Sequence, residues 1–307
     1  MQILRSSLLW ASQSPRMEKL VRSSRAMRPL VSRFMPGESL EEVIASVLAL
    51  KTAGTPTIVT HLGENVASDA AADLTVRDYE QLIGELGATA SGADISIKLT
   101  QFGWDVDQRR ALMRVSAVAG MAAAQKMTLA IDMESSLYVE STIGAYEKLA
   151  REHVNVALCL QAYLHRTPAD LARLLPMSPH IRLVKGAYRE PAAVALTRRA
   201  DVDSRYRVLA RDLLAAVGNG TRVVFGSHDM ALLRSIRQDA RELGVPDGSF
   251  EVQMLFGIQD AGRRELAGQG VPTRVLISYG RAWYPWFMRR LAEKPSNLTM
   301  IARNLIG

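Results

Sequence analysis

Hydrophobic positions along the chain alternate between two spacings. Runs rich in Val, Ile and Leu, of the length of a buried strand, occupy residues 56–62, 94–100, 128–133, 155–164, 180–186, 221–226, 250–256 and 274–279. Segments whose apolar residues recur at helical spacing lie between many of these runs, at residues 106–125, 142–152, 168–175, 204–217, 230–243 and 259–268. Eight buried strands that alternate with helices predict an α/β protein built as a (βα)₈ barrel.

The chain before the first run has a basic character. Residues 1–30 carry six Arg or Lys residues and only Glu18 as an acid, which superficially resembles a transit peptide. Their apolar residues recur at helical spacing, so we expect a structural segment instead. Ser39 and Glu42 have the spacing of a capping box, which predicts a helix start. We therefore predict an N-terminal helical segment over residues 1–50, packed on a barrel formed by residues 51–307.

A helix is also predicted after the last run. Pro285 suits its first turn and Pro295 ends it. Four residues follow the i, i+3, i+4, i+7 rule and share one face: Trp286, Arg289, Arg290 and Glu293. Two guanidinium groups can clamp the carboxylate of a small amino acid while the aromatic ring covers its apolar carbons. The alternative is a solvated face with a Glu293–Arg289 pair.

Composition narrows the classes of function. The 307 residues have a formal charge of +7, but the arginines are scattered and aromatic residues make up only 6%, which disfavours a nucleic-acid binder. Cys159 is the only cysteine, so no intrachain disulfide or thiolate zinc cluster forms, and the five histidines lack metal-ligand spacing. No apolar run reaches the roughly 18 residues of a membrane-spanning helix. We expect no metal, no nucleic acid and no membrane span.

Polar residues mark the carboxyl ends of the runs, where barrel enzymes carry their chemistry. These residues are His61, Lys98, Asp132 with Glu134, Gln161, Lys185, Ser227 with His228, Gln253 and Tyr279. In three runs the polar residue shares a strand face with a small residue two positions earlier: Ser96 with Lys98, Ala130 with Asp132, and Cys159 with Gln161. The sequence therefore predicts a site at the mouth of the barrel.

Two cationic positions have more than one interpretation. Arg182 with Lys185, Gly186 and Ala187 suits an anionic cofactor such as a flavin pyrophosphate, or else ion pairs with acids of neighbouring loops. Arg182 and Lys185 are an odd number of residues apart, so either the strand ends before Lys185 or the two address different ligands. Lys98 is either a Schiff-base lysine, as in barrel aldolases, or a paired structural lysine.

Three other features of the sequence give weaker evidence about function. Asp132 can act as a base, but Glu134 is the only second carboxylate near it, which gives little support for a metal. The triplet Ser227-His228-Asp229 invites comparison with a catalytic triad, although adjacent residues seldom align in that way. No Rossmann glycine motif or P-loop occurs, so groups at the barrel mouth would have to hold any dinucleotide.

Two strings resemble a known family. Residues 279–295 read Tyr-Gly-x-x-Trp-Tyr-Pro-x-Phe-Met-Arg-Arg-Leu-Ala-Glu-x-Pro, and residues 182–188 read Arg-Leu-Val-Lys-Gly-Ala-Tyr. Both closely resemble proline dehydrogenases, and the likeness spans nearly the whole chain. The resemblance implies a distorted (βα)₈ barrel that binds FAD and oxidises L-proline to Δ1-pyrroline-5-carboxylate. Many members have Tyr where this chain has Trp286, which puts substrate affinity and discrimination against hydroxyproline in question.

The resemblance also implies site residues. Lys98, Arg289 and Arg290 would contact substrate, with Tyr279 at a further pocket position, and Asp132 and Arg182 would form the polar pair of the active site. Residues that would line the FAD are Met133, Gln161, Lys185, Gly186, Ala187, Ser227 and His228. Lys98 is expected to pair with Glu293.

Partners and location follow from the same resemblance. Electrons would pass to a quinone, and a separate pyrroline-5-carboxylate dehydrogenase would act next, because 307 residues leave no room for a second domain of that size. We expect a cytoplasmic protein and leave open a peripheral contact of its basic N-terminus with the inner face of the membrane. The competing interpretations are a lysine-dependent aldolase, another barrel flavoenzyme, and a basic module that binds nucleic acid or acidic membranes.

Overall fold

The computed structural model describes residues 14–24, 27–89 and 91–293, and their strands form one closed barrel. All eight strands run parallel, in chain order: β1 (Thr57–His61), β2 (Asp94–Ile97), β3 (Leu129–Ile131), β4 (Val156–Gln161), β5 (His180–Val184), β6 (Arg222–Gly226), β7 (Phe250–Leu255) and β8 (Thr273–Tyr279). β8 pairs with β1 and closes the cylinder. The predicted fold class is confirmed, and each predicted run corresponds to one strand, although β8 begins one residue before its run.

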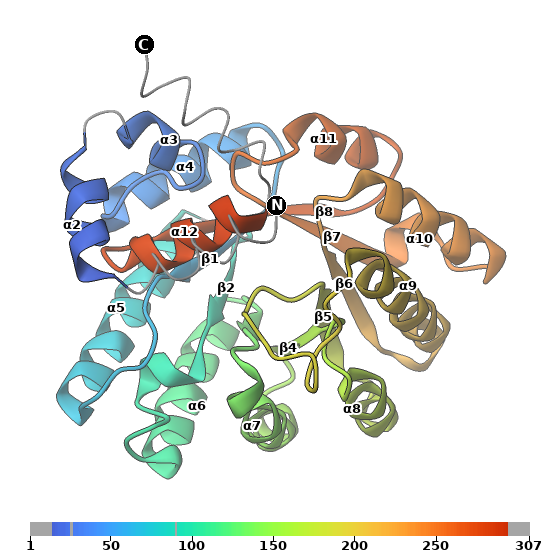
Figure 1. Cartoon of the computed structure of the whole chain (residues 1–307), viewed down its shortest axis with the longest axis horizontal. Coiled ribbons are helices and arrows are strands. Elements are labelled where there is room, and N and C mark those ends of the chain that lie inside the picture. Colours follow the sequence, from blue (N-terminus) through green and yellow to red (C-terminus); the bar gives the residue numbers. More distant parts are fainter. Residues whose placement is uncertain (1–13, 25–26, 90, 294–307) are drawn as a thin grey trace.

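Helices surround the barrel (Figure 1). They are α2 (Pro15–Ser23), α3 (Arg28–Ser32), α4 (Leu40–Thr52), α5 (Asp69–Ala88), α6 (Gln108–Ala124), α7 (Val139–Glu152), α8 (Thr167–Leu174), α9 (Arg199–Ala216), α10 (Met230–Glu242), α11 (Asp260–Gly268) and α12 (Trp283–Glu293). Each of the six helical segments predicted between the runs corresponds to one of them. α5 lies between β1 and β2, where no such segment was predicted.

The helix before β1 completes the outer ring. As predicted, Ser39 and Glu42 form a capping box at the start of α4, in which the Ser39 hydroxyl accepts from the Glu42 N–H at 3.3 Å and the Glu42 carboxylate accepts from the Ser39 N–H at 3.0 Å. Val43 and Val47 are fully buried in the main core, and α4 contacts β1, β8 and α5. α4 thus belongs to the barrel wall, and the division of the chain at residue 50 stays a prediction.

The helix after β8 leaves the ring of helices that surrounds the barrel. α12 packs in a second hydrophobic cluster with Met27, Leu30 and Phe34 of the N-terminal segment. The rings of Phe34 and Phe287 meet edge to face at 6.2 Å. Because α4 already covers β1 and β8, α12 is available to hold residues over the mouth. Pro295, expected to end this helix, and residues 1–13 lie outside the described residues.

One glycine fixes the N-terminal segment to the loop after β7. Gly257 has a φ of +70°, and a Cβ placed on it would lie 1.7 Å from the carbonyl oxygen of Arg33. We expect Gly257→Ala to lower the free energy of unfolding by about 2 kcal/mol or more, since left-handed strain and a backbone clash act together. Gly248→Ala is the control, because a Cβ placed on Gly248 would meet no atom within 4 Å and its φ is not left-handed. Equal stability of the two variants in urea unfolding would contradict this expectation.

Candidate active site

An ion pair inside the barrel joins β5 to the end of β3. Arg182, on β5, is only 4% exposed and pairs with Asp132, which directly follows β3. The Ser96 hydroxyl, on β2, donates to the same carboxylate at 3.4 Å. Ser96 and Asp132 therefore both face the interior, as the period-2 pattern predicted. Burial lowers the pKa of Arg182 to about 10, which still leaves the guanidinium charged at neutral pH.

A second cluster gathers two cations on one carboxylate. Lys98 Nζ, just after β2, lies 3.2 Å from Glu64, just after β1. Arg289, on α12, reaches both oxygens of Glu64, at 3.1 and 3.4 Å, and its guanidinium lies 5.4 Å from the centre of the Tyr188 ring. Because Glu64 follows β1 and Tyr188 follows β5, the side chain of Arg289 connects the loops after these two strands. Lys98 and Arg289 thus converge on a single carboxylate, and the Tyr188 ring lies beside Arg289.

The charge of Glu64 is strongly favoured. Burial by itself would raise the pKa of Glu64, but the charges of Lys98 and Arg289 outweigh it and lower the pKa to about 2. Sequence reasoning missed this residue, although a carboxylate directly after the first predicted run was a usable signal. The expected partner of Lys98 was Glu293, whose side chain lies outside the described residues. The partner that the structure shows is Glu64.

The low pKa of Glu64 predicts a pH dependence of stability. A carboxyl group whose pKa is lower in the folded protein stabilises the fold. This stabilisation is complete above the unfolded pKa of 4.5 and is lost as the pH falls through about 2. We expect the free energy of unfolding of Glu64→Gln to be about 3 kcal/mol lower than that of the wild type at neutral pH. Its deficit relative to the wild type, measured by urea unfolding, should shrink as the pH falls from 4.5 toward 2.

Glu134→Gln supplies the control for that measurement. Burial raises the pKa of Glu134, so the wild-type protein gains stability relative to this variant as the carboxyl is protonated, and the trend has the opposite sign. A deficit of Glu64→Gln that stays constant with pH would contradict the ion-pair assignment.

Lys185 belongs to a third group, at the ends of β5 and β6. Lys185 is an odd number of residues from Arg182, which left open whether the strand ends before Lys185. It does, because β5 ends at Val184. Lys185 Nζ lies 2.5 Å from Asp203 and 3.0 Å from Asp229. Arg199 pairs with the same two acids. In this structure Lys185 therefore makes the ion pairs with neighbouring acids that one interpretation of the sequence foresaw.

The adjacent Ser227, His228 and Asp229 do not form a triad. Asp229 caps α10 and binds the two cations of the third group. Nε2 of His228 accepts from the Leu255 N–H at 2.9 Å, which occupies the nitrogen that a catalytic base would need. Ser227 accepts from the Asp229 N–H at 3.2 Å. Ser227 and His228 nevertheless stand at the mouth, directly after β6.

The ends of β4 and β5 are joined by a buried amide. Gln161 donates to the Glu134 carbonyl at 2.8 Å and accepts from the Ala187 N–H at 3.3 Å. Gly186, beside Ala187, has a φ of +123°, and a Cβ there would lie 2.2 Å from the Tyr163 ring. This backbone bend therefore requires glycine. Met133 is 5% exposed, between Asp132 and Glu134.

Three predicted residues lie at the edge of these groups. The ring of Tyr279, at the end of β8, is 5.0 Å from that of His61, and burial raises the pKa of the Tyr279 phenol. Arg290 is half-buried on α12 next to Arg289. Trp286 is 8% exposed and joins the hydrophobic cluster beneath α12. Tyr279 and Arg290 thus stand at the same end of the barrel as the paired residues, whereas Trp286 serves the packing of α12.

Metal ligands and membrane-spanning helices are both missing from the described part of the chain. Within residues 14–24, 27–89 and 91–293, no group of three His, Cys, Asp or Glu side chains is placed to hold a metal ion. Over the same stretches, no helix has both the length and the apolar character needed to cross a membrane.

A parallel (βα)₈ barrel with charged side chains gathered at the carboxyl ends of its strands has the architecture of TIM-barrel enzymes. Residues 43–303 match the family model described as proline dehydrogenase. The chain is 31% identical to proline dehydrogenase 1 of Bacillus subtilis (strain 168) over 304 residues, 99% of each chain. It is 34% identical to the proline dehydrogenase of Deinococcus radiodurans over 310 residues, 99% of this chain and 98% of that one. The chain belongs to the proline dehydrogenase family, a family of oxidoreductases.

A solved structure agrees on the fold. Proline utilization A (PutA) from Bdellovibrio bacteriovorus, inactivated by N-propargylglycine, superimposes with a TM-score of 0.81 at 22% identity. The match covers 87% of this chain and 33% of that longer one. At this level of identity the likeness supports the barrel fold alone.

Proposed function

We propose that this protein oxidises L-proline to Δ1-pyrroline-5-carboxylate with FAD as its cofactor. The observation that carries the proposal is the convergence of Lys98 and Arg289 on one carboxylate, beside the ring of Tyr188, in a chain of the proline dehydrogenase family. Glu64 is held in the way that an amino-acid carboxylate would have to be held, by a two-pronged guanidinium and an ammonium group. Arg290 lies next to Arg289 and would complete this clamp, with Tyr279 as a further wall of the pocket.

The residues at the ends of β4, β5 and β6 fit a flavin. Gly186 permits a left-handed bend directly after β5, Gln161 and the Ala187 N–H bring amide groups to that bend, and Lys185 brings a positive charge. Nε of Arg182 is buried without a hydrogen-bond partner among the described residues, as a group that awaits a ligand would be. The residues that would hold the FAD are Met133, Gln161, Lys185, Gly186, Ala187, Ser227 and His228. When bound, FAD would supply the acceptor for the hydride that leaves proline C5.

The chain's own residues would bind and orient the substrate. Arg289 and Arg290 would fix the carboxylate, so that the ring of proline lies in a single orientation below α12. Arg182, held by Asp132, would place a buried cation where negative charge develops as the hydride leaves. The ring nitrogen has to be neutral for this step, so activity should fall at low pH as the substrate amine stays protonated.

The remaining partners are also proposals. A quinone would take the electrons, and a separate pyrroline-5-carboxylate dehydrogenase would consume the product. A cytoplasmic location with contact at the inner membrane surface agrees with a quinone acceptor. Lys98 is held in an ion pair by Glu64, which favours the paired-lysine alternative over an aldolase nucleophile.

Lys185→Ala is expected to weaken FAD retention, because it removes the cation beside the backbone bend at Gly186. The ratio of flavin to protein after purification measures this effect. Arg199→Ala is the matched control, since Arg199 pairs with the same two acids but its side chain is 80% exposed. Full flavin occupancy of Lys185→Ala would count against a role in cofactor binding.

The visible spectrum of the purified protein, before and after anaerobic addition of L-proline, tests the proposed function. Flavin absorbance that bleaches with proline would support both the cofactor and the direction of electron flow. A protein that binds no flavin, even after addition of FAD, would overturn the proposal. If flavin is bound but does not bleach, the protein would be a barrel flavoenzyme with another substrate. The effect of Trp286 on substrate choice would then be tested next.

A further inference from the structure

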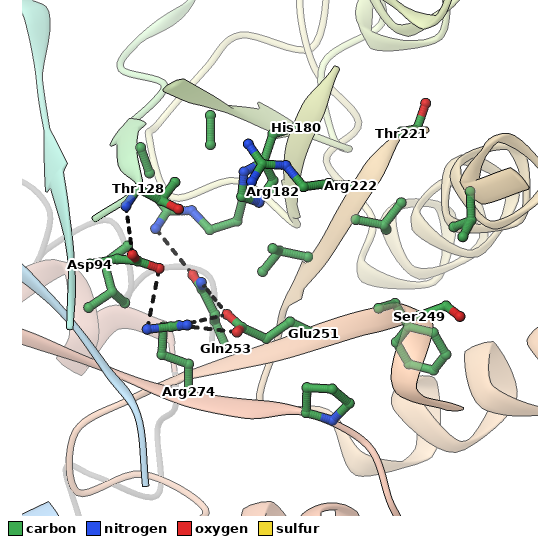
Figure 2. Close-up of a pocket in the computed structure, with 18 of the residues that line it drawn as sticks. Asp94, Thr128, His180, Arg182, Thr221, Arg222, Ser249, Glu251, Gln253 and Arg274 are labelled. Atoms are coloured by element: carbon green, nitrogen blue, oxygen red, sulfur yellow. Dashed lines mark hydrogen bonds and ion pairs between the residues drawn. The ribbon is translucent and has the colours of Figure 1, made fainter. Parts of the chain in front are cut away.

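The interior of the barrel below Arg182 is polar. Bulky branched residues usually fill the interior of such barrels, but here a cavity of about 540 Å³ lies there. Asp94, Glu251 and Arg274 line it from the early positions of β2, β7 and β8, and Arg182 lines its inner part (Figure 2). The cavity therefore extends from the N-terminal end of the barrel to the active-site cation.

A chain of direct contacts crosses this cavity. Arg274 Nε donates to both oxygens of Glu251, at 3.0 and 3.1 Å. Gln253 Nε2 donates to Oε1 of Glu251 at 2.7 Å, and Nη1 of Arg182 donates to Oε1 of Gln253 at 3.3 Å. Figure 2 shows these contacts in succession, from β8 through β7 to β5. We call Arg274, Glu251, Gln253 and Arg182 the interior relay.

The two charged neighbours of Gln253 fix its amide orientation. A carboxylate only accepts hydrogen bonds and a guanidinium only donates them. The NH₂ group of Gln253 must therefore face Glu251, which leaves its carbonyl oxygen for Arg182. A flipped amide would put oxygen against oxygen and N–H against N–H. Gln253 is 7% exposed, so solvent compensates little for such a mismatch.

Stability is a weak reason for this arrangement. Buried ion pairs often contribute little net stability compared with apolar residues of similar size, because their desolvation offsets their attraction. Hydrogen bonds between buried polar side chains do restrict these side chains to one geometry. Arg182 is the member of the relay that also reaches the mouth, through Asp132. The network is therefore placed to set the position of that guanidinium.

We propose that Glu251 is a positioning residue for the active site: by orienting the Gln253 amide, it holds the Arg182 guanidinium in place against Asp132. The inference rests on the proposed function, in which Arg182 supplies the buried cation near the reacting atoms. It adds a remote carboxylate, at the opposite end of the barrel from the mouth, to the residues that determine the rate. In the proposed function, Glu251 itself would touch neither substrate nor cofactor.

The contacts around Arg274 indicate that variants at Glu251 and Asp94 should still fold. Without Glu251, Arg274 keeps Asp94 at 3.3 Å and the carbonyl oxygens of Thr57 and Gly92 at 2.9 and 3.1 Å. Oε1 of Glu251 accepts from both Arg274 and Gln253, so Glu251→Gln can keep an oxygen at that point. Asp94→Asn is a matched control, because it removes the other acidic partner of Arg274 and leaves Gln253 untouched.

The test is a double-mutant cycle in kcat and KM for proline. We expect Gln253→Leu and Glu251→Leu each to lower kcat by about tenfold or more, as for one hydrogen bond to a charged group, with KM within about twofold. The double variant should be no slower than Gln253→Leu alone, since Glu251 acts through Gln253. Glu251→Gln and Asp94→Asn should stay within about threefold of the wild type.

Four results would overturn the proposal: additive losses in the double variant, a wild-type rate for Glu251→Leu, an equal loss in Asp94→Asn, or losses confined to KM. A crystal structure of Glu251→Leu gives a readout independent of activity. We expect a rotated Gln253 amide and a displaced Arg182, and an unchanged Arg182 would reject the relay. If the wild-type protein does not oxidise proline, the proposed function fails, whereas this structural comparison still decides the relay.

Discussion

Arg182→Met should lower kcat for proline oxidation by roughly 100-fold to 1000-fold and change KM far less. Removal of one preorganised group that stabilises developing charge in a buried site costs about this much. Arg182 is 4% exposed and its partner Asp132 comes from a different strand, so no mobile surface cation can replace it. The cations that would bind the substrate carboxylate, Lys98 and Arg289, belong to the separate cluster around Glu64. The loss of Arg182 should therefore change the rate without changing substrate binding. Steady-state kinetics with L-proline measures both constants.

The control for this prediction separates chemistry from folding. Arg182→Met leaves the Asp132 carboxylate buried without its cation, which should cost about 3–5 kcal/mol of stability. The double variant Arg182→Met, Asp132→Asn removes both charges and should recover much of that stability, but not the activity. A double variant that regains the rate, or an Arg182→Met protein with kcat within threefold of the wild type, would remove Arg182 from the reaction.

Much of the fold could be predicted because the strands are continuous apolar runs. The C-terminal polar residue of each run also located the mouth, and parity correctly turned Ser96 and Asp132 inward. The packing partner of the last helix was harder to predict. α12 shares an apolar cluster with Met27, Leu30 and Phe34. The periodicity of α12 does not show that it packs against this N-terminal segment rather than against β8 and β1.

The partners of the site residues depend on loops. Glu64 and Asp229 lie on loops whose path the hydrophobic pattern does not determine, and Asp203 lies in the first turns of α9, before the predicted start of that helix at residue 204. The charges inside the barrel escaped prediction for another reason. Asp94, Glu251 and Arg274 lie near the starts of their strands, an end usually associated with stability alone, so only the observed contacts with Gln253 connect them to Arg182.

The second large effect concerns the carboxylate clamp. Arg289→Met is expected to raise the KM for proline by about 10-fold to 100-fold, because a hydrogen bond to a charged group is worth about 1.5–3 kcal/mol. The flavin should be retained, since Arg289 contacts Glu64 and Tyr188, neither of which is among the residues proposed to hold the FAD. Arg290→Met should act in the same direction.

Arg281→Met provides the matched control for the clamp, because it removes a guanidinium from an exposed residue just before α12. Its KM should equal that of the wild type, and flavin content should be the same in all three variants. Loss of flavin from Arg289→Met would indicate that α12 supports the cofactor rather than the substrate. If neither Arg289→Met nor Arg290→Met changes KM, the convergence of cations on Glu64 is a structural ion pair, and the substrate carboxylate has to bind elsewhere in the mouth.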